Sequence, residues 1–490
     1  MPEKLPGCDE HNESNDKSIL GGRGSVSRRE FLKIAGVAGA AIGVGAGLGG
    51  LVTACGEAQE TTTTAGPTTT AGPTTTAAAS TTTVSAGPET GREVKIGVVL
   101  PSTGMLAVFA INLPWSLKLI EQYIGDTMVL GDGKNHKVTW VTRDSQSDSN
   151  RASQVASDLI LNDKVDLLVS GGPETTAPVM DQAETLEQPC IVTGMPWQAV
   201  VFGRGKTMDT VEKWVFGHLF GAEQGTAGLV TVMDKVSTNK VVGVFQPNTE
   251  DGMAWMSPDI GIEDTFQRAG YTPVFPGFFN VGTEDFTSLI QDYKKAGCEI
   301  HMGSNPGPDF PNYWNQALQQ GYRPKVCIEV VGLASSESKA GLGDACLGIV
   351  TGYTWHKSWP YTDPISQMTC PELADSYEAE FNTVWNLFIA GHSRMGWAVD
   401  VLKRTRDIDS KDSIVEAIKT TKMELCTGPI DMTAPVDPAG MRVTANIYKQ
   451  PWGYGQIEKG TKWEFDVPLV AMVDAPEVKV DRDPIPMSYT

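Results

Sequence analysis

The chain has 490 residues, of which 40% are hydrophobic and 20% charged, and its formal net charge is −20. This charge excludes nucleic acids and anionic lipid head groups as direct partners, because their phosphates repel it. The 52 glycines follow no triplet period, there are 8 cysteines, and one long apolar run occurs. Collagen, disulfide-scaffold and polytopic membrane classes are therefore excluded, and a soft prior of about 150 residues per domain predicts two large lobes or about three units.

The apolar run, residues 34–54, carries no charge and is rich in glycine, which weakens a membrane-spanning helix. Ser27-Arg28-Arg29-Glu30-Phe31-Leu32-Lys33 precedes it. This segment resembles a twin-arginine export signal, with Arg28 and Arg29 as the paired arginines, and the resemblance implies folding before export. The alternative is a basic cluster that flanks an anchor helix.

Leu51-Val52-Thr53-Ala54-Cys55-Gly56 resembles a bacterial lipobox, which implies a signal peptide over 1–54 and acylation of Cys55. The alternative is an ordinary signal-peptidase site beside a chance cysteine. Residues 55–92 repeat Ala-Gly-Pro-Thr-Thr-Thr without apolar periodicity, so we expect a disordered tether. Such a tether spans about 35 Å as a random coil.

The body that follows alternates strands and helices. In chain order we predict a strand at 94–100, a helix ending near 124, a strand at 136–144, a helix at 150–161, a strand at 165–170, a helix at 175–186 and a strand at 190–193. Strands separated by helices of about a dozen residues predict βαβ units and a parallel sheet.

After a loop over 202–221 the pattern restarts. We predict, in order, helix 222–236, strand 240–246, helix 259–270, strand 272–279, helix 285–296, strand 299–303, helix 309–321 and strand 325–330. The remainder is less regular, with helices at 372–388, 396–405 and 413–420 and short strands near 442–448 and 464–466. A second α/β unit therefore follows the first.

Motifs for catalysis, metals and cofactors are scarce. The sequence holds no Cys-x-x-Cys, no His-Glu-x-x-His and no phosphate-binding Gly-x-x-x-x-Gly-Lys-Ser/Thr, so we expect no metal, no cofactor and no enzyme. Gly391-His392-Ser393-Arg394-Met395-Gly396 looks superficially like a nucleophile elbow, but its glycine spacing is wrong and no strand precedes it.

Six cysteines remain after residue 55. We expect Cys190 and Cys298, which begin apolar runs, to be buried thiols. An even number outside the cytoplasm permits disulfides, and the possible pairs are Cys327–Cys346 and Cys370–Cys426.

Polar turns follow several of the predicted strands, at 101–104, 172–176, 194–197 and 246–252. Ligands bind at this edge of open α/β sheets, where hydroxyls and helix amides can hold a polar head. The alternative for Ser102 and Thr175 is helix capping.

Several segments, in this order and spacing, resemble the substrate-binding proteins of ABC importers of the branched-chain amino-acid-binding type. They are 96–104, 143–148, 281–290, 314–317 with Gly321, and 427–431. The resemblance implies the type I periplasmic-binding-protein fold: two Rossmann-like α/β lobes with parallel sheets, joined by a three-segment hinge near 203–220, 348–359 and 427–435. Lobe 1 would span 93–210 and 357–430, lobe 2 would span 211–356 and 431–480, and 481–490 would be a tail.

The resemblance also implies ligand-binding positions in the interlobe cleft: Ser102, Thr103, Phe109, Glu174, Thr175, Thr176, Met195, Trp197, Asp251, Asn305, and Glu329 or Val331. Two positions depart from the amino-acid-binding pattern. Glu174 follows Pro173 in one turn, and Trp197 stands where a threonine is typical. An aromatic or cationic ligand stacked on Trp197 is therefore a competing prediction, and packing of Trp197 in the core is the third.

The function implied is that of an extracytoplasmic lipoprotein that captures a small polar solute, an amino acid, amide or aromatic acid, and delivers it to an ABC importer. Its partners would be that solute and the permease subunits, with the membrane contacted only through the lipid and no nucleic acid bound. We expect a monomer. The alternatives are a ligand-sensing receptor module of the same fold and an enzyme that uses the cleft.

Overall fold

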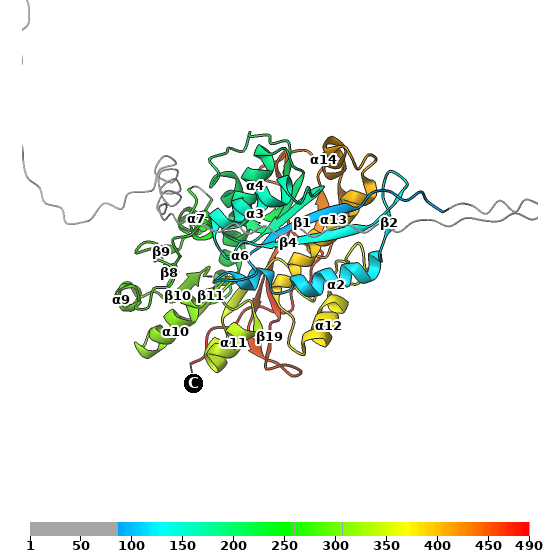
Figure 1. Ribbon diagram of the computed structural model, residues 1–490. Coiled ribbons are helices and arrows are strands. Elements are labelled where there is room, and N and C mark those ends of the chain that lie inside the picture. Colours follow the sequence, from blue (N-terminus) through cyan, green and yellow to red (C-terminus); the bar gives the residue numbers. More distant parts are fainter. Residues whose placement is uncertain (1–86, 259, 306, 490) are drawn as a thin grey trace, which may run out of the picture. The chain divides into compact units, whose positions relative to one another are not determined.

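Two seven-stranded sheets organise the body of the protein (Figure 1). The computed structural model describes residues 87–258, 260–305 and 307–489. All of them belong to one compact unit. The predicted signal peptide, with Arg28 and Arg29, and the acylation site at Cys55 lie outside the described residues.

The first sheet has the strand order β15-β16-β7-β6-β5-β1-β4. Its strands are β1 (Val94–Leu100), β4 (Val138–Asp144), β5 (Leu167–Gly171), β6 (Cys190–Pro196), β7 (Val215–Phe220), β15 (Arg442–Thr444) and β16 (Ile447–Lys449). Neighbouring strands run parallel except β15, which is antiparallel to β16.

Helices cover both faces of this sheet (Figure 1). On one face lie α3 (Ser149–Leu161), α4 (Thr176–Thr185) and α5 (Trp197–Val201); on the other lie α2 (Leu113–Ile124), α13 (His392–Arg404) and α14 (Lys411–Lys419). In β1, for example, Val98 packs towards α13 and Val99 towards α3. Burial on both faces explains why these strands are continuous apolar runs.

The second sheet has the order β20-β17-β12-β11-β10-β8-β9. Its strands are β8 (Val241–Phe245), β9 (Thr272–Val274), β10 (Ile300–Gly303), β11 (Val326–Glu329), β12 (Val350–Tyr353), β17 (Trp452–Gln456) and β20 (Leu469–Val473). The first five are parallel, and β17 is antiparallel to both β12 and β20. The predicted fold class, two α/β lobes built on parallel sheets, is confirmed.

Helices also cover both faces of the second sheet. One face holds α6 (Ala222–Asp234) and α8 (Ile262–Arg268); the other holds α9 (Thr287–Ala296) and α10 (Asp309–Gln319). An aromatic cluster fills the second face, where the rings of Phe245 and Tyr313 stack with centroids 4.2 Å apart. We call the two sheets with their helices the first and second lobes.

Shorter elements connect these layers. They are η1 (Ala107–Ala110), α7 (Glu250–Trp255), α11 (Ser336–Leu342), η2 (Gly343–Cys346), α12 (Cys370–Phe381) and η3 (Leu387–Gly391), with the hairpins β2–β3 (Met128–Val129, Asn135–His136), β13–β14 (Lys422–Leu425, Gly428–Asp431) and β18–β19 (Glu458–Lys459, Phe465–Asp466). Over the described residues, no helix has the length and hydropathy that a membrane span requires.

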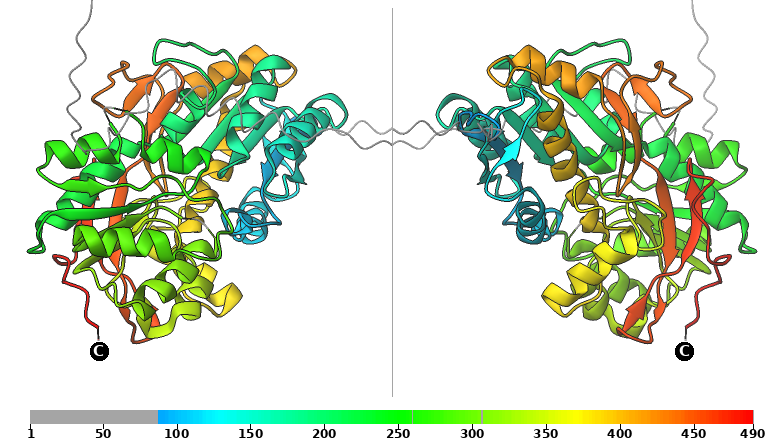
Figure 2. Two further views of the ribbon diagram at one scale, coloured as in Figure 1. Left: turned by 90° about the vertical axis from the view of Figure 1, so that its left-hand side faces the viewer. Right: turned by 90° about the vertical axis from the view of Figure 1, so that its right-hand side faces the viewer.

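We call the points where the chain passes from one lobe to the other crossings. Two of them differ from the predicted lobe boundaries. Strand β7 lies inside the predicted loop 202–221 and pairs with β6 in the first sheet; its apolar run is interrupted by Gly217 and His218, which hid it. Strands β15 and β16 also belong to the first sheet, and β17 to the second (Figure 2). The third crossing is therefore at Gln450 and Pro451, and the predicted crossing at 427–435 is wrong.

Both ends of the described body differ from the predicted boundaries. Thr90 bridges to Asn135, and Arg92 pairs with Asp166 at 2.7 Å, so folded structure begins before residue 92. The predicted tail is bound to the second lobe: the Met487 N–H donates to the Lys325 carbonyl, 2.8 Å away. Backbone pairing determines where the folded body begins and ends, and the amino-acid composition does not indicate this pairing.

All six described cysteines are buried free thiols, so the suggested pairs Cys327–Cys346 and Cys370–Cys426 are not disulfides in this structure. The thiol of Cys370 instead donates to the Cys426 carbonyl at 3.3 Å. Burial raises the pKa of the Cys190 and Cys298 thiols as well, which keeps them protonated and unreactive.

Candidate functional site

A cavity lies where the carboxyl ends of the two sheets meet. The first lobe lines it with η1, the turn after β5, the last residues of β6, η3 and the start of α13. The second lobe contributes Asp251, Val331, Thr354 and Trp452, and the crossings contribute Phe220 and Gln450. Parallel α/β sheets present their binding edges in this way, so both lobes face the same enclosed space.

Much of the cavity wall is flat and apolar. Phe109 meets Phe388 edge to face with ring centroids 5.1 Å apart, and Phe220 packs on Trp452 at 4.4 Å. Met195 adds a polarisable side chain from the end of β6. Such a wall favours a ligand with a planar, apolar body.

Arg394 brings a positive charge to this apolar cavity. It stands in the first turn of α13, only 5% exposed, and its Nε donates to the Gly391 carbonyl at 2.9 Å. Its Nη1 is buried without a hydrogen-bond partner, and no ion pair joins its guanidinium to a carboxylate of the described residues. Burial lowers the pKa of Arg394 to about 10, so the group remains charged at neutral pH.

Two glycines make room for this guanidinium. A Cβ on Gly171, at the end of β5, would overlap Nη1, and a Cβ on Gly391 would overlap Nη2. The close approach explains glycine at both positions without any special backbone angle. The arginine is therefore held in a fitted space beside the cavity.

Two further residues that line the cavity carry buried polar atoms without hydrogen-bond partners. These atoms are Thr193 Oγ1 and Gln450 Nε2. Buried polar groups are normally paired, because leaving one unpaired costs about 1–3 kcal/mol. With Arg394, three residues of the cavity lining therefore carry an unpaired donor.

Asp251 is the one carboxyl group among the lining residues. It belongs to α7, and its Oδ2 accepts a hydrogen bond from Ser304 Oγ at 3.1 Å. Burial raises the pKa of Asp251 to about 7. The second lobe therefore offers a group that can be protonated near neutral pH.

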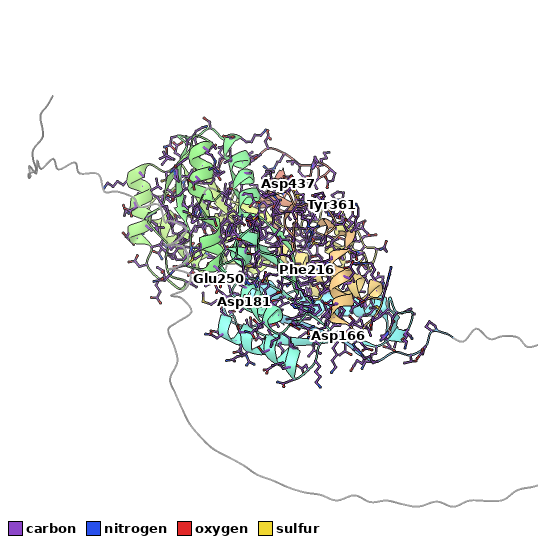
Figure 3. The ribbon with its side chains drawn as sticks, turned by 90° about the horizontal axis from the view of Figure 1, so that it is seen from above. Asp166, Asp181, Phe216, Glu250, Tyr361 and Asp437 are labelled. Atoms are coloured by element: carbon purple, nitrogen blue, oxygen red, sulfur yellow. The ribbon has the colours of Figure 1, made fainter. Side chains whose placement is uncertain are left out.

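A pair of acids, one from each lobe, meets beside the cavity. Glu174, in the turn after β5, has a left-handed backbone with φ 57° and accepts hydrogen bonds from Ser149 Oγ, 3.2 Å away, and from the Glu250 backbone N–H. Burial raises the pKa of Glu174, and burial together with Glu174 and Asp181 raises that of Glu250 to about 8. Figure 3 shows Glu250 and Asp181 on the same side of the molecule.

The structure brings some of the predicted site residues together and separates others. Phe109, Met195 and Asp251 line the cavity, as does Val331, the stated alternative to Glu329. Asn305 and Glu329 do not; they bind each other inside the second lobe at 2.7 Å.

The predicted hydroxyl groups also lie elsewhere. Ser102 and Thr103 hold Asp144, since both backbone N–H groups and the Thr103 hydroxyl donate to its carboxylate. Thr175 bonds Ser145 at 2.8 Å, and Thr176 donates to the Gly172 carbonyl at 2.8 Å. Local hydrogen bonds therefore occupy the hydroxyls of Thr103, Thr175 and Thr176, as such side chains commonly allow.

Trp197 is a core residue in the structure and not a wall of the cavity. It is 4% exposed, packs edge to face on Phe202 at 5.3 Å, and donates from Nε1 to Glu223 at 3.0 Å. Because β6 continues through Pro196, Trp197 opens α5 and turns into the first lobe. Of the three predictions for Trp197, core packing matches this geometry.

Sequence reasoning missed Arg394, Phe388, Gln450 and Trp452. The segment Gly391–Gly396 was considered only as a nucleophile elbow. A sharper signal was available there, because a charged arginine stands in a helix whose other early residues are all buried. Such an arginine needs a partner or a ligand.

The model of the periplasmic binding protein family matches residues 93–448. The chain belongs to this family. A second model, for the twin-arginine translocation signal sequence, matches residues 25–45, which indicates export and confirms that part of the sequence analysis.

Relatives of this periplasmic binding protein are distant. A Leu/Ile/Val-binding protein homolog of Brucella abortus is 23% identical over 248 residues, which cover 48% of this chain and 57% of the relative. The match thus spans little more than half of that curated relative.

Solved structures share the fold over most of the body. A Rhodopseudomonas palustris solute-binding protein in complex with 3,4-dihydroxybenzoic acid is 21% identical, with a TM-score of 0.60, and covers 79% of this chain and 99% of its own. The Streptococcus pneumoniae LivJ protein in complex with isoleucine is 17% identical, with a TM-score of 0.58, and covers 77% of this chain and 99% of its own.

Proposed function

We propose that this protein captures a small organic solute in the interlobe cavity and delivers it to an ABC importer. The observation that carries the proposal is the cavity itself, which takes its lining from both lobes and from two crossings between them. A ligand that touches both lobes stabilises the closed arrangement over the open one, which is how a hinged binding protein signals occupancy. The similar proteins named above, with an amino acid and an aromatic acid bound, support this class of solute.

The test is ligand-dependent stability. At one hundred times its dissociation constant, a bound solute stabilises by about 2.7 kcal/mol, which raises the melting temperature of a chain this large by several degrees. We expect such a shift with at least one member of a panel of amino acids, amides and aromatic acids. Ala390→Trp, which fills the cavity from η3, should abolish it. A shift that persists in this variant, or no shift with any class of solute, contradicts the proposal.

We further propose that the exported protein is anchored by lipid at Cys55, with the threonine-rich segment as a tether. The lipobox-like residues before Cys55 support this, and a lipid with two acyl chains is sufficient for stable anchoring. Cys55→Ala is expected to release the protein from membranes or to stall its processing, as measured by fractionation and by the mass of the N-terminal peptide. Cys8→Ala is the matched control. If Cys55→Ala stays in the membrane and is cleaved at the same site, the proposed lipid anchor is contradicted.

A further inference from the structure

We propose that the solute is a small carboxylic acid with a flat apolar body, and that its carboxylate pairs with Arg394. This inference rests on the proposed solute-binding function and narrows it to one chemical class. It is carried by a buried, unpaired guanidinium that faces an apolar cavity.

The charge of the guanidinium determines the charge of the ligand. A buried cation without a partner is costly, and a carboxylate supplies the missing charge with two oxygens that match the guanidinium fork. The acids near Arg394 in the chain have other partners: Asp363 pairs with His392 at 3.4 Å, Glu380 with Lys118 at 2.6 Å and Asp400 with Arg404 at 2.6 Å. The partner of Arg394 must therefore come from the ligand.

The remaining donors favour the same group. Thr193 Oγ1 and Gln450 Nε2 both lack acceptors, and an ionised carboxylate offers about four acceptor sites and no donor. A neutral amide offers one carbonyl oxygen and leaves the guanidinium unpaired. The ammonium of an α-amino acid lies one carbon from its carboxylate and would stand close to Arg394, where it is repelled.

The apolar walls favour a ligand whose uncharged part is planar and apolar. Phe109, Phe388 and Trp452 offer ring faces and edges, which bind planar rings better than flexible chains because less conformational entropy is lost. A doubly charged anion such as phosphate fits poorly, because it has no apolar surface to place against these rings. An aromatic monocarboxylate satisfies both the charge and the shape.

Calorimetric titration of the purified protein tests the inference with three probes of similar shape: benzoate, benzamide and phenylalanine. We expect benzoate to bind at least about 100-fold more tightly than benzamide. Arg394→Gln should weaken benzoate binding by about 100-fold while leaving the ligand-free melting temperature equal or higher, because an unpaired buried charge has been removed. Arg323→Gln, an exposed arginine of the second lobe, is the matched control and should bind as the wild type does.

Arg394→Lys keeps the test decisive if the glutamine variant does not fold. It retains the charge and loses the planar fork, so we expect benzoate binding to weaken by about tenfold. Tight binding of phenylalanine or benzamide without benzoate would overturn the inference and leave the proposed function standing. Unchanged benzoate affinity in both Arg394 variants would also overturn it. A protein that responds to no solute of any class would overturn the proposed function itself.

Discussion

Trp197→Ala is expected to lower the free energy of unfolding by about 3–5 kcal/mol, the usual cost of removing a large buried aromatic side chain. The indole is 4% exposed, packs on Phe202 and fills the core between α5 and the first sheet. Removing the indole also deletes its hydrogen bond to Glu223, whose carboxylate still accepts from Gln198 and Lys449. Urea denaturation of the ligand-free protein measures the effect.

Trp197→Phe separates the packing from the hydrogen bond. This variant keeps one aromatic ring, loses the N–H donor and leaves part of the indole volume empty, so we expect a cost of about 1–2 kcal/mol, well below that of Trp197→Ala. Ligand affinity of the folded fraction should be unchanged in both variants, because Trp197 does not line the cavity. A near-normal melt of Trp197→Ala combined with lost ligand binding would show that the indole touches the ligand.

Ligand affinity is expected to fall by up to about 100-fold as the pH rises from 6 to 9. The reason lies in Glu174 and Glu250, which meet across the lobes. In the structure, where the two acids are in contact, the pKa of Glu250 is raised to about 8. When the lobes separate, water reaches this carboxyl group and its pKa returns towards the ordinary value of about 4.3. The arrangement with the lobes together therefore binds more protons between about pH 4.3 and 8, and it becomes less favourable as the pH rises through this range.

The surrounding charges act in the same direction or are already paired. Asp148 faces Glu174, and Asp251 has its own raised pKa, so both add to the repulsion at high pH. Asp181 faces Glu250 but is paired with Arg204 at 2.8 Å. On α6, which packs beside α7, Glu223 is paired with Lys449 at 3.3 Å. Arg394 stays charged throughout this range.

Titrations of benzoate at several pH values measure this dependence, since benzoate stays ionised between pH 6 and 9. Glu250→Gln is expected to flatten the profile and to raise the affinity at pH 9. Glu121→Gln, an exposed position on α2, serves as the control and should retain the full dependence. A wild-type profile that is flat, or one that rises with pH, contradicts the interlobe acid pair as its cause.

The order of strands and helices in the body could be predicted from the sequence because parallel strands buried on both faces are short apolar runs. The prediction failed where tertiary pairing decides the structure. Strand β7 carries Gly217 and His218, so it has no strong local signal. It is a strand because it pairs with β6 and with β16, which is distant in the sequence.

The same limit applies to the site. Turns at strand ends could be predicted, and Phe109, Met195 and Asp251 do line the cavity. The sequence could not show which hydroxyls are free. The hydroxyls of Thr175 and Thr176 form hydrogen bonds with neighbours that only the fold brings close. Arg394 comes from a helix rather than a strand-end turn, and its unpaired state depends on which carboxylates are absent from its surroundings.

The late strands have a consequence for how the protein is made. Strand β16, residues 447–449, adds to a sheet begun at residue 94, and β20, residues 469–473, completes the other. A ribosome must therefore synthesise nearly all of the 490 residues before either sheet has its full set of strands. Until then the growing chain exposes unpaired strand edges, which favour aggregation and chaperone binding. We expect truncations before residue 447 to leave both lobes incomplete, so that neither lobe can be produced as a continuous piece of the chain.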